Sequence, residues 1–167
     1  VYDVTRDSTG TLWIATWGGL CSYDPHASPS NQFRRYNNDK QKVARLYSVH
    51  KLKNQNLLWV SGDDGCYVFD ISRKQWTDWP NAKTAEGIGR QTVRDFYEDA
   101  QGNIWLGTER NGVVYYDPRS GNIISTPVVA PGTRSVVRSL RADGDGFLRV
   151  GADNGWLKLD KQSHKIV

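Results

Sequence analysis

Short apolar runs alternate with polar turns along the chain, and the clearest series extends from Val93 to Asp117. Three strands are predicted there, at Val93–Glu98, Asn103–Thr108 and Val113–Asp117. They are rich in Val, Ile, Tyr, Phe and Trp, which favour a pleated, packed surface. Gly102 and Gly112 lie where the chain must reverse, and glycine reaches positive φ without steric cost. The pattern therefore predicts an antiparallel β-meander.

The same pattern occurs four times. The other copies span Val1–Asp24, Leu46–Asp70 and Val137–Asp160. Equivalent positions of the four copies are occupied by Trp13, Trp59, Trp105 and Arg149, which are 46, 46 and 44 residues apart. An aspartate closes the third strand of every copy, at Asp24, Asp70, Asp117 and Asp160. A fixed period of this size, built from strands, indicates a repeat architecture.

A variable connection and a fourth strand follow each closing aspartate. We expect these strands at Phe33–Tyr36, Gln75–Trp79, Asn122–Pro127 and from Lys165 to Val167. Each unit is then a four-stranded antiparallel meander of about 45 residues, the size of one propeller blade. Stacking such sheets face to face would bury both faces of a blade. The predicted fold class is all-β: one β-propeller segment over residues 1–167, with blades near 1–40, 41–84, 85–129 and 130–167.

Composition fits a globular protein, because 38% of the 167 residues are hydrophobic and 24% are charged. No apolar run approaches the ~20 residues needed to cross a bilayer. The pattern opens and stops within strands, so we expect a piece of a longer chain. Cys21 and Cys66 fall in third strands one register apart, which points their side chains to opposite sheet faces. Two free thiols are therefore expected, and the redox compartment stays open.

The repeat resembles the two-component regulator propeller repeat. The shared features are a D-x-x-G turn, a following W-x-G/A-T strand end and a closing Y-D pair, best preserved in the first and third copies. In the second copy Asn54-Gln55-Asn56 replaces the turn, and in the fourth Arg149 replaces the tryptophan. Together the copies cover nearly the whole chain.

This resemblance implies the periplasmic sensor region of a hybrid two-component receptor that senses polysaccharide fragments. The membrane helix and the kinase would lie outside the sequence. Propellers of that family have about seven blades, so four would form an incomplete ring; a closed four-bladed propeller is the alternative. An incomplete ring exposes the apolar faces of its end blades, and we expect the chain to self-associate through them.

Ligand-binding residues are expected on loops at one edge of the blades, since loops on a rigid scaffold carry most recognition. Trp17 could stack on a sugar ring or cap the neighbouring blade. Arg110 could bind a carboxylate or sulfate in forked geometry, or remain a solvated loop residue. Arg45, Arg90 and Arg134 each precede an inner strand, where they could bind a ligand or pair with loop carboxylates.

The net charge is +4, and several basic residues gather near the start of the second copy: Lys40, Lys42, Arg45, His50, Lys51 and Lys53. A basic surface attracts anions, and an acidic oligosaccharide suits the family better than nucleic acid, for which no known reader motif is present. A solvated surface without a ligand is the alternative. The Gly62-Asp63-Asp64-Gly65 segment is interpreted as a turn and not as a cation site, because a cation needs several converging oxygen ligands.

Catalysis has little support in the sequence. No His, Cys and Asp cluster has metal-ligand spacing, no serine lies in a nucleophile elbow, and no carboxylate pair suggests acid–base work. His26 and His164 fall in connections after third strands, and His50 ends an inner strand. We therefore expect a non-enzymatic protein without cofactor or metal. A structural or protein-binding propeller segment is the alternative to a ligand sensor.

Overall fold

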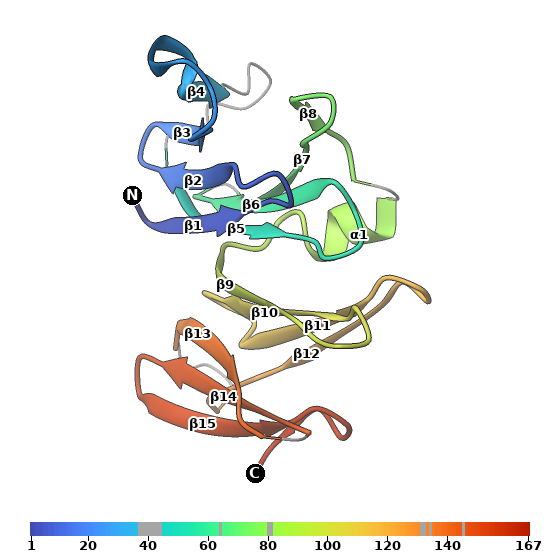
Figure 1. Cartoon of the computed structure of the whole chain (residues 1–167). Coiled ribbons are helices and arrows are strands. Elements are labelled where there is room, and N and C mark those ends of the chain that lie inside the picture. Colours follow the sequence, from blue (N-terminus) through green and yellow to red (C-terminus); the bar gives the residue numbers. More distant parts are fainter. Residues whose placement is uncertain (37–44, 64, 80–81, 131–132, 134, 145) are drawn as a thin grey trace. The chain divides into compact units, whose positions relative to one another are not determined.

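A computed structural model describes residues 1–36, 45–63, 65–79, 82–130, 133, 135–144 and 146–167 (Figure 1). The chain divides into two compact units, Val1–Arg90 and Gln91–Val167. Each unit contains two four-stranded antiparallel sheets, and the strands of every sheet neighbour one another in chain order. The predicted all-β fold of four four-stranded blades is confirmed.

The first unit consists of two sheets with four strands each. The first sheet contains β1 (Asp3–Arg6), β2 (Leu12–Thr16), β3 (Gly19–Tyr23) and β4 (Phe33–Tyr36). The second contains β5 (Leu46–Lys51), β6 (Leu57–Gly62), β7 (Gly65–Asp70) and β8 (Gln75–Thr77). A 3-10 turn, η1 (Pro29–Asn31), precedes β4, and the helix α1 (Ala82–Gly87) follows β8.

The second unit repeats this arrangement. Its first sheet, the third of the chain, contains β9 (Val93–Glu98), β10 (Ile104–Thr108), β11 (Val113–Asp117) and β12 (Asn122–Thr126). The fourth sheet contains β13 (Val137–Ala142), β14 (Phe147–Ala152), β15 (Gly155–Asp160) and β16 (Lys165–Ile166). The predicted strands agree with these bounds to within two residues.

Each unit has a core between its two sheets, as stacking of blades requires. In the first unit Trp13 and Leu20 of the first sheet pack with Leu58 and Phe69 of the second. In the second unit Trp105 and Val113 pack with Leu148 and Leu159. Trp13 and Trp105 are among the largest fully enclosed side chains, with at most 2% exposed. These two tryptophans therefore hold neighbouring blades together.

The aspartate of the D-x-x-G turn anchors the repeat tryptophan. Trp13 donates its indole N–H to Asp7 Oδ2 at 2.8 Å, and Trp105 donates to Asp99 Oδ2 at 3.3 Å. The other carboxylate oxygen of each aspartate accepts backbone N–H groups within its own turn. In the fourth sheet Arg149 occupies the tryptophan position and donates to Asp143 at 3.0 Å. The turn and the aromatic position are thus one hydrogen-bonded unit.

A second aspartate joins neighbouring inner strands within each unit. Asp3 Oδ2 accepts the backbone N–H of Val49 at 2.9 Å, and Asp95 Oδ2 accepts that of Leu140 at 2.8 Å. These bonds connect β1 to β5 and β9 to β13, where the sheets are packed. Asp3, the first residue of β1, and Asp95, the third residue of β9, therefore each satisfy a backbone donor of the next blade in the same unit.

The helix α1 was not expected, because its sequence lies in a connection assigned to loop. Its turn is completed by the Ile88 N–H, which donates to the Thr84 carbonyl at 2.9 Å, and both residues are buried. Cys21 and Cys66 are free thiols, as expected. Among the described residues, no helix is both long and apolar enough to cross a membrane.

Candidate functional site

The loop between β2 and β3 presents Trp17 to solvent. Thr16 Oγ1 accepts the Gly18 N–H at 3.1 Å and donates to the Gly19 carbonyl at 2.8 Å, which closes the loop tightly. Gly19 has a φ of +110°, a conformation that disfavours a side chain. A side chain at Gly18 would meet Arg35, whose Nη2 lies 2.7 Å from the Cβ position. Trp17 remains 61% exposed at the tip of this constrained loop.

Arg45 lies against Trp17 from the neighbouring blade. Its Cζ is 4.0 Å from the centroid of the indole ring, which is cation–π geometry. Arg45 directly precedes β5, so the two residues come from different sheets of the same unit. The structure therefore brings together two of the residues singled out in the sequence.

Tyr47 and Asp63 hold Arg45 in this position. Arg45 Nη1 donates to Tyr47 Oη at 3.4 Å, and Tyr47 in turn donates to Asp63. The Nε of Arg45 is 3.9 Å from Asp63 Oδ2. The hydrogen bond to Tyr47 and the nearby Asp63 charge outweigh partial burial and raise the pKa of Arg45. The result is a permanently charged guanidinium beside a half-exposed carboxylate and an exposed indole.

A recurring acid was missed in the sequence analysis. Asp63, Glu109 and Asp153 follow the second strand of their blades, and each bonds the second residue of the inner strand of the same sheet. The partners are Tyr47, Arg94 and Arg138 respectively. The backbone N–H of each acid also donates to the residue just before the inner strand. These acids could have been found from the sequence, because an acidic residue recurs directly after the second strand in three of the four copies. In the first blade Trp17 takes the acid's place.

The other predicted ligand residues are not part of this cluster. Arg90 is exposed in the turn after α1, where its backbone runs beside Gly65. Arg110 is exposed in the loop between β10 and β11 of the second unit. Arg134, with Lys40 and Lys42 of the basic segment, lies outside the described residues. Of the five candidates, Trp17 and Arg45 are therefore the pair that the structure places in contact.

His164 and His26 lie in connections that follow third strands. His164 stacks on Trp105 with ring centroids 5.2 Å apart and packs edge-on against Tyr115. Burial lowers the pKa of His164. His26 follows the closing aspartate of the first blade, whose side chain accepts its backbone N–H. Among the described residues, no group of three His, Cys, Asp or Glu side chains could hold a metal ion.

Comparisons with known proteins agree with the repeat and the fold. Residues 87–110 match the family model of the two component regulator propeller, which confirms the resemblance identified in the sequence. No curated protein shows a significant match to the chain.

Solved structures also share the fold. The extracellular domain of BT3049 from B. thetaiotaomicron, named as a hybrid two component system, aligns with all of this chain at a TM-score of 0.76 and 19% identity. The extracellular domain of BT4673 from the same organism, also named as a hybrid two component system, aligns with 98% of this chain at a TM-score of 0.59 and 18% identity. The chain spans 24% and 26% of these two domains. Virginiamycin B lyase from Staphylococcus aureus aligns with 99% of this chain, and the match covers 54% of the lyase, at a TM-score of 0.69 and 14% identity.

Proposed function

We propose that the chain is a non-catalytic sensor segment of an extracytoplasmic region in a hybrid two-component receptor. It would bind a glycan-derived ligand, or transmit its binding, in the periplasm, with the kinase elsewhere in the parent protein. The match of residues 87–110 to the regulator propeller family supports the receptor assignment. The extracellular domains that share the fold support a location outside the cytoplasm. The fold alone does not decide function, because a lyase shares it.

The pairing of Trp17 with Arg45 is the observation on which glycan binding rests. An exposed indole offers an apolar face on which a sugar ring can stack. The adjacent guanidinium and Asp63 carboxylate can bind ring hydroxyls, or a sugar acid group in the case of Arg45. Because Thr16 and Tyr47 already fix the loop and the guanidinium, little side-chain freedom would be lost on binding.

The alternative is a structural or protein-binding segment without a small ligand. It is favoured by the acids Glu109 and Asp153, which are already paired with Arg94 and Arg138 at the same place in the second unit. Internal pairing of this kind leaves those charges less available to a ligand.

Calorimetric titration of the chain with neutral and acidic oligosaccharides tests the proposal. We expect saturable binding of at least one oligosaccharide, and Trp17→Ala should weaken it by roughly tenfold, since stacking on an aromatic side chain contributes about 1 kcal/mol or more. Trp156→Ala is the matched control, because Trp156 is also exposed, at 66%, beneath the guanidinium of Arg149. No binding by any oligosaccharide, or equal losses in both variants, would favour the alternative.

A further inference from the structure

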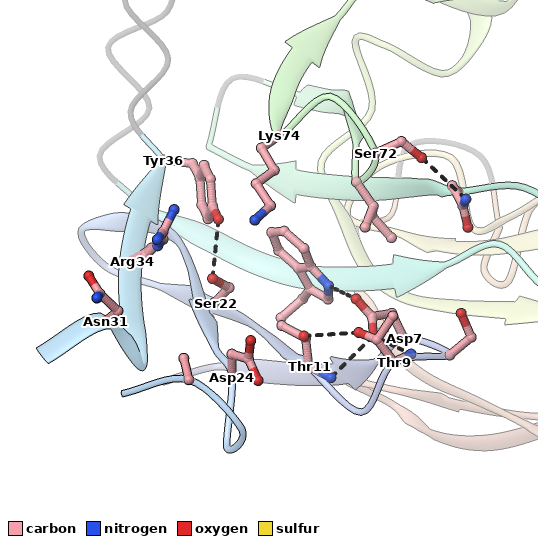
Figure 2. A pocket seen from close by; sticks show the side chains of 15 residues that line it. Asp7, Thr9, Thr11, Ser22, Asp24, Asn31, Arg34, Tyr36, Ser72 and Lys74 are labelled. Carbon is pink, nitrogen blue, oxygen red and sulfur yellow. Dashed lines mark hydrogen bonds between the residues drawn. The ribbon is translucent and has the colours of Figure 1, made fainter. Parts of the chain in front are cut away.

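A cavity of about 450 Å³ lies between the two sheets of the first unit. Its walls come from the β1–β2 turn, the β3–β4 connection and β4 of the first sheet, and from the β7–β8 turn of the second (Figure 2). These turns are at the end of the strands opposite to the loop of Trp17. The volume falls within the ~300–1,000 Å³ range of small-molecule pockets. The cavity is therefore separate from the Trp17 and Arg45 cluster.

The lining is rich in groups that bind hydroxyls. Ser22 and Tyr36 share a hydrogen bond of 3.3 Å on one wall, and Asp24 and Asn31 lie beside them. On another wall, both carboxylate oxygens of Asp7 already accept hydrogen bonds. Oδ1 accepts the backbone N–H and the hydroxyl of Thr9 and the backbone N–H of Thr11, and Oδ2 accepts the indole N–H of Trp13. These hydrogen bonds outweigh the effect of burial and lower the pKa of Asp7, so this carboxylate stays charged. A bound polyol would meet fixed acceptors and hydroxyl groups.

Two cations, Arg34 and Lys74, line the cavity. Arg34 extends from β4 and Lys74 from the β7–β8 turn, so they come from different blades and face the same hollow (Figure 2). Within the described part of the chain, neither makes an ion pair. By contrast, Arg73, the neighbour of Lys74, is close to Asp70, with Nε 3.7 Å from Oδ2. Unpaired cations that converge from two walls favour an anionic group on the ligand.

The second unit shows how the corresponding space can be filled from within. Lys74 and His164 occupy the same place in their turns, four residues after the closing aspartate, with φ of 54° and 56°. His164 stacks on Trp105 and packs against Tyr115. Ser22 of the first sheet is equivalent to Tyr115 of the third sheet, because Ser22 pairs with Trp13 and Tyr115 pairs with Trp105. In the first unit, Ser22 and Lys74 thus stand at the positions where the second unit has the aromatic rings of Tyr115 and His164.

From these features we infer that the cavity binds a monosaccharide-sized hydroxy acid, whose carboxylate lies between Lys74 and Arg34 and whose hydroxyls meet Asp24, Asn31 and Ser22. The arginine offers forked geometry to a carboxylate, whereas the lysine provides a point charge. Asp7 and Asp24 also line the cavity but form no ion pair with either cation, so a neutral sugar would leave both cations unpaired among the described residues. A simple carboxylate would leave the hydroxyl-binding groups unused. Both features of the ligand are therefore required.

Calorimetric titration of the whole chain with D-glucuronate tests this inference. Saturable binding is expected, with much weaker binding of D-glucose, which lacks the carboxylate, and of acetate, which lacks the hydroxyls. Lys74→Gln and Arg34→Gln should each weaken binding of glucuronate by roughly tenfold or more, because each removes a charge-assisted contact. Arg73→Gln is the matched control: it removes the same charge one residue away, outside the lining, and should leave affinity unchanged.

A triple variant tests the position of the site by closing it. Ser22→Tyr, Tyr36→Thr and Lys74→His together introduce the residues of the third and fourth sheets at Tyr115, Thr126 and His164, and should abolish binding. Thermal unfolding of each variant shows whether it is folded. If the triple variant is unfolded, the affinities of Lys74→Gln and Arg34→Gln for glucuronate decide whether the cavity is the binding site.

Absence of saturable glucuronate binding would overturn the inference. So would equal binding of glucose or acetate, or unchanged affinity in Lys74→Gln and Arg34→Gln. Variants at Trp17 test the proposed glycan sensor separately.

Discussion

At the scale of single residues, the repeat is built around a few side chains that each satisfy several backbone groups. The aspartate of the D-x-x-G turn both closes the turn and positions the repeat tryptophan, as Asp7 and Trp13 show. Arg149 keeps this connection in the fourth sheet, because a guanidinium can donate to Asp143 as an indole does. In the fourth sheet the departure from the repeat in sequence therefore keeps the hydrogen bond to the turn.

Asp7→Asn should lower the free energy of unfolding by about 1–3 kcal/mol, because an amide cannot accept all the hydrogen bonds of the carboxylate. Urea unfolding at neutral pH measures the loss. The folded-state pKa of Asp7 is below its ordinary value of 3.8, so its contribution is present above that pH and declines as the pH falls through the folded-state pKa.

Asp143→Asn is the control for Asp7→Asn. It changes the same position of the repeat, but its partner Arg149 is largely exposed, and the expected loss is under about 1 kcal/mol. Equal losses in the two variants would show that burial of the tryptophan does not strengthen the hydrogen bond.

At the scale of elements, the strand pattern and the turns could be predicted from the sequence, since the period of 44 to 46 residues fixes both. The bounds of β9 and β11 agree with the prediction residue for residue. The helix α1 could not be predicted in this way, because its sequence lies in a variable connection outside the repeated strand pattern. Trp17 and Arg45 were candidates from the sequence, whereas their contact depends on two blades and became visible in the structure.

Gly112→Ala and Gly121→Ala should differ in their effects although both glycines have nearly the same φ, 68° and 69°. Each alanine bears a backbone strain of about 1–2 kcal/mol. A Cβ at Gly112 would also lie 2.2 Å from the Thr126 carbonyl oxygen, whereas nothing lies within 4 Å of one at Gly121. Gly112→Ala should therefore cost at least ~1 kcal/mol more in chemical unfolding. Equal costs would mean that β11 and β12 separate without penalty.

At the scale of the whole molecule, self-association remains a prediction. The first strand exposes Val4 at 46%, and the fourth sheet exposes Trp156 at 66%. On that face of the fourth sheet, however, cations lie over the aromatic rings: Arg149 over Trp156, and Lys158 with its Nζ 4.1 Å from the centroid of Phe147. This covering reduces the apolar surface available to a second copy.

Light scattering over a range of concentrations measures the association. We expect oligomers that weaken as the protein is diluted, and Trp156→Ser should shift the equilibrium towards the monomer because it removes apolar area from the exposed face. High salt should not dissociate them if apolar contact is the driving force. A single monomeric species at all concentrations would contradict the prediction.

Lys74, Gly121 and His164 occupy one backbone position, each with a left-handed conformation and each with a different side chain. The hairpin therefore tolerates an ammonium group, a hydrogen atom or an imidazole there without rearrangement. Substitutions at this position could consequently alter what fits beneath the turn while leaving the strands in place. Diversity in ligand preference among such proteins would then accumulate at hairpin tips faster than in the sheets.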